Sequence, residues 1–392
     1  MTKSDDKRVP TLRFKGFTDE WEQRKLGDVL EKFQKRINPE KENIPLWSLT
    51  VKDGLIPKNA QYNRSFLVKK NDFFNLLPDN YLIYNPMNIT LGAIDINNSG
   101  KEIAVSGYYI ILKIKSNYNE EFVLNNLVSR KSINLYQRFS TGSLTEKQRL
   151  QYPAFSKIKK LFPDFTEQRK IGSLLSALNK QITLQQRKLI ELQLLRTSLN
   201  QQLLKDNSSW KSVKLREILN IRNKQIFPNQ QYPLMSFVQK QGVVPKSQRY
   251  NRDFLVKGNK KYKVTEKGDF IYSSNNLEAG SIGINKTGNA TISPVYSVFS
   301  SKNYKESLFI GLLSEKKSFI YKMIRFRQGV VYGQWKIPEK DFLNIKIKIP
   351  NYQEQEKIIT LFTHIDNQFK QENKKLTDLQ NFKQFLLQNM FI

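Results

Sequence analysis

Few side chains in this sequence are of the kinds that carry catalysis, and the clearest candidates are acidic. Asp164 and Glu167, followed by Arg169, have the residue types of a metal-dependent nuclease centre. A second copy of the segment holds Asn351 and Glu356 in place of Asp164 and Arg169, so the acid and the base are both lost. A helix start explains the segment better, because acidic residues in a first turn complement the positive end of the helix dipole.

The chain has one histidine and no cysteine, which excludes a zinc site built from those residues. His364 lies between Leu361 and Ile365 of an apolar helical stripe, so a structural position on that helix is the plainer interpretation. Its counterpart in the first copy is Ala177, which argues against a duplicated catalytic role. The absence of cysteine also fits a reducing cytosol and predicts a cytoplasmic protein.

Two short patterns are similar to motifs that handle nucleotides or bases. The segment 283–288, GINKTG, has the glycine spacing of a phosphate loop but lacks the Lys-Ser/Thr pair that contacts phosphate and magnesium. The segment 84–87, YNPM, is similar to the Asn-Pro-Pro-aromatic motif of adenine methyltransferases. It lacks the second proline and the aromatic residue, and no glycine-rich cofactor loop precedes it. We interpret both as turns, and we predict a chain that binds and positions, with no catalytic residue, metal or cofactor of its own.

The charge balance points to a polyanionic partner. The formal net charge is +30, from 65 Lys and Arg against 35 Asp and Glu. The alternative is a chain that is basic for solubility or through host composition, since Lys and Asn are frequent throughout. No run of about 18 apolar residues occurs, so we expect no membrane partner. The polar start, residues 1–10, has no signal-peptide core and predicts a loose tail.

Two long helices are predicted from a repeated apolar stripe. The stretch 163–204 recurs at 350–391 with a constant offset of 187 (350 − 163), and its apolar residues are spaced alternately by three and four. The breaks in the stripe also coincide, with Gln185 matching Glu372 and Arg196 matching Lys383. About forty residues make a rod on the order of 55–60 Å. Two such rods most simply pair with each other, antiparallel, as a spacer.

The segments before the two helices also repeat one another. Trp21 in the first corresponds to Trp210 in the second, and the segment 45–58, PLWSLTVKDGLIPK, corresponds to 233–246, PLMSFVQKQGVVPK. Short apolar runs with Gly and Pro turns predict strands in both copies. The copies have diverged mostly in the segments that follow Tyr84 and Tyr272, and in 141–145 compared with 328–332, where side chains could recognise a ligand.

These repeats predict an α+β chain that imitates a homodimer, with two tandem α/β heads and an antiparallel coiled coil related by a pseudo-two-fold axis. A fused dimer with diverged heads can recognise two different sequences at a fixed separation. The predicted parts are a loose tail at 1–10, a first head at 11–161, a central helix at 162–206, a second head at 207–348 and a C-terminal helix at 349–392.

The doubled set of motifs resembles the specificity subunit of type I restriction-modification systems over nearly the whole chain. The marks are the Trp…Lys-Leu-Gly-Asp opening at Trp21 to Asp28, its copy at Trp210 to Glu217, the Leu-Ile-Tyr and Phe-Ile-Tyr strand ends with a following Gly, and the doubled Glu-Gln-x-Lys-Ile helix start. One departure is that the first head lacks a close match to the segment 332–335, YGQW.

The resemblance implies a subunit that recognises DNA and leaves the chemistry to its partners. Each head would be a target recognition domain for one half of a bipartite double-stranded DNA sequence. The helices would set the spacer length and dock two methyltransferase subunits, with translocase-endonuclease subunits joining for cleavage. S-adenosylmethionine, ATP and magnesium are expected on those partners. A bacterial, nucleoid-associated location is also implied.

Candidate DNA contacts divide into two groups. Basic residues that the two copies largely share are expected to contact phosphates: Lys58, Arg64, Lys69, Lys246, Arg249, Arg252 and Lys257. Polar residues on the diverged segments are expected to contact base edges: Asn85, Asn88, Thr90, Ser274, Asn275, Asn276, Tyr332 and Gln334. The shared Tyr-Asn-Arg segments could instead be turns that maintain the fold, and any one of the base candidates could be a solvated loop residue.

Docking of the methyltransferase subunits is expected at apolar helix positions off the main seam, for which the candidates are Leu175, Leu195 and Phe382. These residues could equally pack against the chain's own heads. Another function left open by the sequence is a stand-alone bivalent nucleic-acid-binding scaffold that needs no methyltransferase. A self-sufficient nuclease or methylase would need catalytic groups that we do not find in the sequence.

Overall fold

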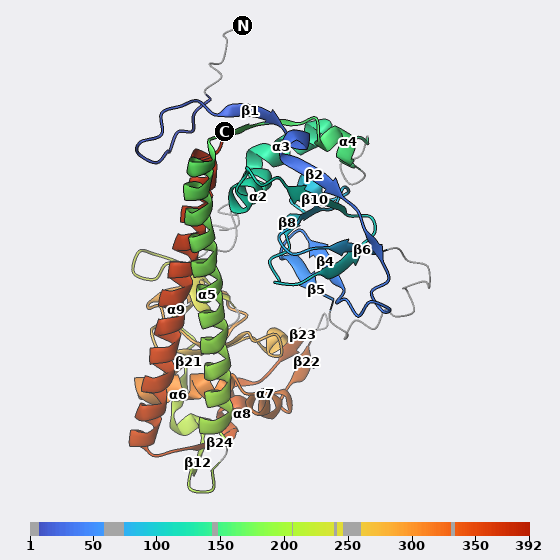
Figure 1. Cartoon of the computed structure of the whole chain (residues 1–392). Coiled ribbons are helices and arrows are strands. Elements are labelled where there is room, and N and C mark those ends of the chain that lie inside the picture. Colours follow the sequence, from blue (N-terminus) through green and yellow to red (C-terminus); the bar gives the residue numbers. More distant parts are fainter. Residues whose placement is uncertain are drawn as a thin grey trace. The chain divides into compact units, whose positions relative to one another are not determined.

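The structure, a computed structural model, describes residues 8–58, 74–142, 148–205, 207–238, 241–245, 260–330 and 334–392 (Figure 1). The chain divides into two compact units. Unit 1 comprises Met1–Arg187 and Asn373–Ile392, and unit 2 comprises Lys188–Glu372. Each unit therefore contains one strand-rich head and one part of each long helix, α5 (Phe165–Leu203) and α9 (Tyr352–Asn389).

The head of unit 1 combines short strands with short helices. Its strands are β1 (Glu22–Lys25), β2 (Leu30–Phe33), β3 (Arg36–Ile37), β4 (Trp47–Thr50), β5 (Gly54–Pro57), β6 (Phe74–Leu77), β7 (Leu82–Tyr84), β8 (Ile94–Ile96), β9 (Ile103–Ser106), β10 (Ile110–Ile114) and β11 (Lys159–Phe162). Its helices are α1 (Leu26–Val29), η1 (Ile89–Leu91), α2 (Glu120–Val128), α3 (Arg130–Phe139) and α4 (Tyr152–Phe155).

The head of unit 2 has the same kinds of element in a similar order. Its strands are β12 (Lys211–Lys214), β13 (Leu219–Ile221), β14 (Gln225–Ile226), β15 (Met235–Val238), β16 (Gly242–Pro245), β17 (Tyr262–Thr265), β18 (Phe270–Tyr272), β19 (Ile282–Ile284), β20 (Ala290–Ile292), β21 (Ser297–Ser301), β22 (Gln328–Val330), β23 (Gln334–Lys336) and β24 (Lys346–Ile349). Its helices are η3 (Leu215–Glu217), η6 (Ser274–Asn276), α6 (Tyr304–Ser314), α7 (Lys317–Ile324) and α8 (Glu339–Asn344).

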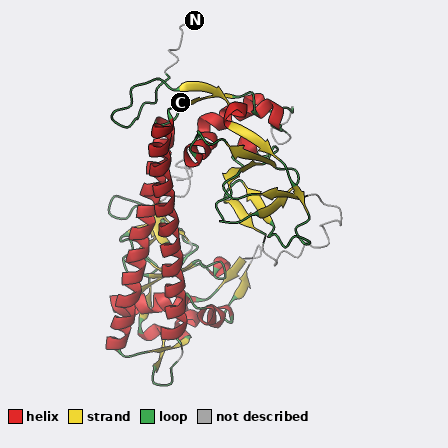
Figure 2. Ribbon diagram, in the orientation of Figure 1, coloured by secondary structure: helices red, strands yellow, loops and turns green. Residues whose placement is uncertain are grey.

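The two heads share their strand order, which confirms the repeat. In unit 1 the sheets run β2-β10-β7-β8, β3-β6-β9, β4-β5 and β1-β11. In unit 2 the corresponding orders are β13-β21-β18-β19, β14-β17-β20, β15-β16 and β12-β24. Unit 2 adds the hairpin β22-β23, whereas the matching part of unit 1 shows an isolated bridge between Thr141 and Arg149, with residues 143–147 outside the described residues. Figure 2 shows the strands of both heads in yellow and the long helices in red.

The repeated Trp openings are core elements. Trp21 packs edge-on against Phe122 with ring centroids 5.7 Å apart, and Trp210 packs edge-on against Phe309 at 5.8 Å. The acidic residue that ends each opening caps the turn that contains it, because Asp28 accepts a hydrogen bond from the Lys25 backbone N–H at 3.3 Å. Glu217 makes the equivalent bond in unit 2 at 2.8 Å. The opening motif therefore maintains the fold.

In each unit the two long helices run antiparallel, as predicted. In unit 2, Lys188 pairs with Glu372 at 2.8 Å and Arg196 pairs with Asp366 at 2.6 Å, so positions rise along α5 as they fall along α9. In unit 1 the start of α5 shares one apolar core with the end of α9, through Ile171, Leu175, Leu178, Leu386 and Met390. The alternating spacing of three and four therefore identifies the contact between the helices.

The chain near the predicted tail is held at its inner end. The backbone N–H of Trp21 donates to the backbone carbonyl of Arg8 at 2.9 Å, and Pro10 is buried. Arg13 then makes a bidentate contact with the buried Glu167 on α5, at 2.8 and 2.7 Å. Residues 8–10 belong to the ordered unit and were wrongly placed in a loose tail, because their anchors are distant in sequence. Residues 1–7 lie outside the described residues.

Candidate nucleic-acid interface

Of the expected phosphate contacts, the described part of the chain contains one. Lys58 follows β5, and its side chain is exposed, as a phosphate contact requires. The other six expected contacts lie outside the described residues: Arg64, Lys69, Lys246, Arg249, Arg252 and Lys257.

In unit 1 the expected base contacts surround the short helix η1. The carbonyl Oδ1 of Asn85 accepts from the Met87 backbone N–H at 3.0 Å, so this side chain shapes the turn before η1. Asn88 is half-buried. Thr90 is only 7% exposed, and its prediction as a base contact is wrong because η1 turns it inward against the head. Met87 and Leu91, neither of which was predicted, are exposed on the same segment.

In unit 2 two of the expected base contacts are engaged within the protein. Ser274 Oγ accepts from the Ile337 backbone N–H at 3.0 Å, and Asn275 Oδ1 accepts from the Trp335 backbone N–H at 2.5 Å. Asn276 and Gln334 are exposed, whereas Tyr332 lies outside the described residues. The short helix η6 is therefore joined to strand β23 and the residue after it.

An ion pair that the sequence did not indicate lies beside this junction. Arg327 donates from both terminal nitrogens to the carboxylate of Glu278, each at 2.8 Å, and the guanidinium lies 5.5 Å from the centroid of the Trp335 ring. The Arg327 hydrogen bonds lower the pKa of the Glu278 carboxyl below its usual value. Glu278 and Arg327 are 49 positions apart, and no local spacing signals such a pair.

The residues expected to dock a partner differ in exposure. Leu195 in unit 2 is 49% exposed and Phe382 in unit 1 is 50% exposed. Leu175 is fully buried in the core of unit 1, so its prediction as a docking residue is wrong. The physical reason is that the head covers this face of α5, which a two-helix seam alone would leave open.

The segments considered for catalysis have structural roles. Asp164 accepts from the backbone N–H groups of Thr166 and Glu167 at 2.7 and 3.0 Å, and Asn351 accepts from that of Glu354 at 2.9 Å, so both cap a helix. The glycine-spaced segment 283–288 comprises the end of β19 and the start of the loop to β20, in which Asn285 Nδ2 donates to the Gly288 carbonyl at 2.7 Å.

Among the described residues, no group of three or more His, Cys, Asp or Glu side chains is placed to hold a metal ion, and His364 is exposed on α9. No described helix is long and apolar enough to cross a membrane.

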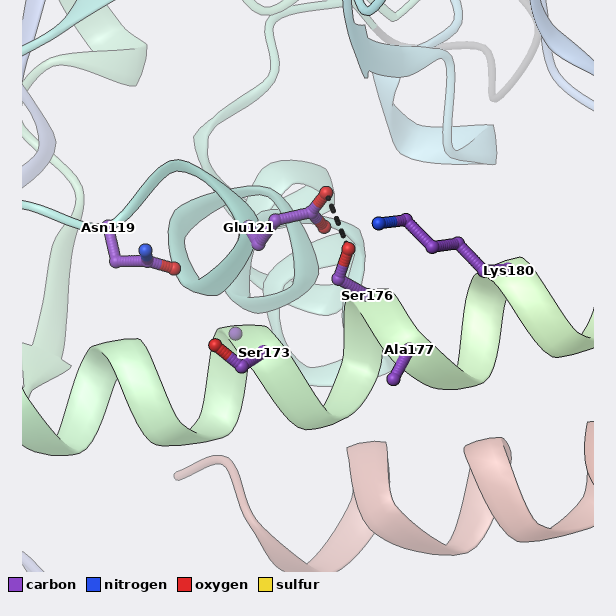
Figure 3. Close-up of a pocket in the computed structure, with 7 residues that line it drawn as sticks. Asn119, Glu121, Ser173, Ser176, Ala177 and Lys180 are labelled. Atoms are coloured by element: carbon purple, nitrogen blue, oxygen red, sulfur yellow. Dashed lines mark hydrogen bonds between the residues drawn. The ribbon is translucent and has the colours of Figure 1, made fainter.

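A shallow polar cavity of about 300 Å³ lies within unit 1, between the start of α2 and the first half of α5 (Figure 3). Ser176 Oγ donates to Glu121 at 3.4 Å, and Lys180 lies on the next turn of α5. The close approach of the two helices requires Gly172, because a Cβ there would lie 2.1 Å from the side-chain oxygen Oδ1 of Asn119. The matching position in unit 2 is Ile359, which is buried in that unit's core.

Comparisons with known proteins agree with this architecture. Residues 207–381 match the family model described as the type I restriction modification DNA specificity domain. Among solved structures, the chain is similar to the S subunit of the type I restriction-modification system from M. genitalium, with 14% identity and a TM-score of 0.67 over 98% of this chain and 99% of that chain.

Another similar chain comes from a structure solved to explain complex assembly and conformational transition of the type I R-M system. It has 16% identity and a TM-score of 0.50, with 94% of this chain and 96% of that chain covered. No protein in the search of curated proteins matches the sequence. At such identities the structural likeness concerns the fold, and it extends over both heads and both long helices.

Proposed function

We propose that this chain is a specificity subunit of the type I restriction-modification family and recognises a bipartite double-stranded DNA target, with one half contacted by each head. In this role the chain recognises DNA and leaves catalysis to its partners. The observation that carries the bipartite proposal is the strand order that the two heads share in four corresponding sheets, combined with different side chains after β7 and β18.

The charge of the chain supports DNA as the ligand of both heads. A net charge of +30 favours binding to phosphates and makes the affinity fall steeply as the salt concentration rises. Phosphate contacts position a protein without specifying sequence, so the differing polar residues of the two heads would supply the two specificities.

We assign the helices two roles, as a spacer and as docking surface. In each unit, contacts between α5 and α9 fix the register of the two antiparallel helices. A helix pair with a fixed register has a fixed length, which suits a ruler. Leu195 and Phe382 are large exposed apolar side chains on these helices and suit contact with two methyltransferase subunits. S-adenosylmethionine chemistry would then belong to those subunits, and ATP and magnesium chemistry to translocase-endonuclease subunits.

Mapping methylated adenines across the genome of cells that carry the chain and its methyltransferase tests the proposal. We expect one motif with two specified parts separated by unspecified bases, which disappears when the chain is deleted. A contiguous motif, or methylation that persists without the chain, would contradict the proposal. Tight, sequence-specific binding by the isolated chain, with no methyltransferase required, would favour the stand-alone scaffold.

The docking role is tested by co-purification of the methyltransferase with variants of the full chain. Leu195→Glu and Phe382→Glu should each reduce the amount recovered, because each places a charge in an apolar contact. Gln201→Glu is the matched control, since Gln201 is an exposed polar residue of α5 and should leave recovery unchanged. Equal recovery with all three variants would contradict the assignment.

The ruler role is tested by removing one four-residue turn from α5 and one from α9 around the Lys188–Glu372 pair. The change shortens the helix pair by about 6 Å, so the unspecified spacer should shorten by about two base pairs. An unchanged spacer in the methylation map would rule out the ruler.

A further inference from the structure

The hairpin β22-β23 presents one polar face to solvent. Gln328 lies opposite Lys336, and Gln334 lies two residues before Lys336 on the same strand, so these three residues share a face. Gly329 lies opposite Trp335 on the other face. Gln328, Gln334 and Lys336 are all exposed (Figure 1 shows the hairpin). Residues 331–333, between the strands, lie outside the described residues.

The outer edge of β23 is fixed to the head, although Trp335, whose side chain lies on the other face of the hairpin, is 47% exposed. The oxygens of Ser274 and Asn275 accept from the backbone N–H groups of Ile337 and Trp335, so they are directed at this edge. Arg327 leads into β22, lies near the Trp335 ring and is bound by Glu278. These contacts hold β23 and the residue that leads into β22, and they occupy the side-chain oxygens of Ser274 and Asn275.

A two-stranded ribbon is one of the two elements that fit the major groove of B-DNA. Glutamine amides can make paired hydrogen bonds with adenine edges, and a lysine ammonium suits the acceptors of guanine. The polar face therefore has the shape and the donor and acceptor groups needed for major-groove contact. Arg327 is unsuited to contact phosphate, because its side chain is 10% exposed and its charge is matched by Glu278.

We propose that β22-β23 is the major-groove element of the second head, with Gln328, Gln334 and Lys336 as its base contacts and with Ser274, Asn275, Glu278 and Arg327 as positioning residues. This inference rests on the proposed function, and it moves two predicted base contacts, Ser274 and Asn275, into a positioning role.

Methylation mapping with variants of the full chain and its methyltransferase tests the assignment. Gln334→Ala should relax the preference at one base pair of one half-site by about 5- to 150-fold, the range for loss of one good base contact. The other half-site should remain unchanged and serves as an internal control. Gln225→Ala is the matched variant, because Gln225 is an exposed glutamine of unit 2 in another sheet, and it should leave the motif intact.

Two variants of Asn275 separate positioning from base contact. Asn275→Asp keeps the oxygen that accepts from the Trp335 N–H but removes the amide N–H groups that a paired contact with adenine requires. Asn275→Asp should therefore retain the base preference of the wild type. Asn275→Ala should weaken the base preference at several positions of the same half-site.

The outcomes distinguish the inference from the function on which it rests. If the wild-type chain gives a bipartite motif, but Gln334→Ala, Gln328→Ala and Lys336→Ala leave it unchanged, the hairpin assignment is wrong and the bipartite function stands. If Asn275→Asp changes the preference at a single base pair, Asn275 is itself a base contact and the positioning role is wrong. If the wild-type chain gives no bipartite motif, both fail.

Discussion

The two heads share one strand order but place their polar groups in different locations. In unit 1, Lys160 on β11 is buried and donates to Ser132 Oγ at 2.8 Å. In unit 2 the matching positions hold Ile347 and Phe319, both buried and apolar. Unit 2 instead has its ion pair of Glu278 and Arg327 beside the exposed hairpin. The repeated fold thus depends on the alternation of apolar residues in the strands, which leaves individual interior and surface positions free to diverge.

The largest expected difference between the units concerns the acidic residue that opens each long helix. Glu167 is fully buried and pairs with Arg13, whereas Glu354 is half-buried and accepts from Trp210 Nε1 at 3.2 Å. Glu167→Ala leaves a guanidinium without its partner and should lower the free energy of unfolding by about 3–5 kcal/mol. Glu354→Ala should cost about 1 kcal/mol. Urea unfolding of the full chain measures both, and equal costs would contradict this comparison.

A smaller difference in stability between the units is expected at Arg196 and Lys383, the matched polar breaks in the apolar stripe. Arg196 binds Asp366 at 2.6 Å and Glu315 at 2.8 and 2.9 Å within unit 2, so Arg196→Met should cost about 1.5–3 kcal/mol by freeing two carboxylates. Burial lowers the pKa of its counterpart Lys383 in unit 1. Lys383→Met should therefore be neutral or stabilising. Thermal unfolding of the two variants checks the pair, and a greater loss from Lys383→Met would reverse the comparison.

The third difference is one of pH dependence. Burial lowers the pKa of Lys160 from an ordinary value of 10.5 to about 7. Between these values the unfolded chain binds more protons than the folded chain, so the free energy of unfolding rises with pH from about 7 to 10. The contribution is at most about 1.4 kcal/mol per pH unit. Below pH 7, Lys160 is charged in both states and the cost of burying its charge is fully present.

Lys160→Ile replaces Lys160 by the residue type found at the matching position of unit 2. It should remove the contribution of Lys160 to the pH dependence of the free energy of unfolding. Urea unfolding at pH 6, 7, 8 and 9 should show the variant more stable than the wild type at pH 6, with the difference narrowing as the pH rises. Lys159→Ile is the control, because Lys159 is the exposed neighbour on the same strand and should keep the wild-type slope. Parallel curves for the wild type and Lys160→Ile would show that Lys160 does not titrate in this range.

The sequence predicted the features that depend on periodicity and repetition. The constant offset predicted matched heads, and the apolar stripe predicted two long helices close to the limits of α5 and α9. The helix starts were predicted from acidic residues in the first turns, and in the structure Asp164 and Asn351 cap these turns. How the heads are placed relative to one another was predicted as pseudo-two-fold, and it stays a prediction.

The features that sequence reasoning missed arise from contacts between distant residues. The residues around Leu175 in the sequence do not indicate that the head covers it. Those around Thr90 do not indicate that η1 turns its side chain inward. The bond from the Trp335 N–H to Asn275 joins positions 60 residues apart. A diverged polar segment therefore identified the region of the candidate site, but it could not separate base contacts from the residues that position them.

The central claim is that one chain carries two heads of the same fold with separate specificities. The most direct test is a chimera in which residues 207–348 are replaced by a second copy of residues 11–161, followed by methylation mapping in cells that carry the methyltransferase. We predict a motif in which both specified parts are the half-site of the first head. Persistence of the original second half-site would contradict the claim, because no second head would remain to recognise it.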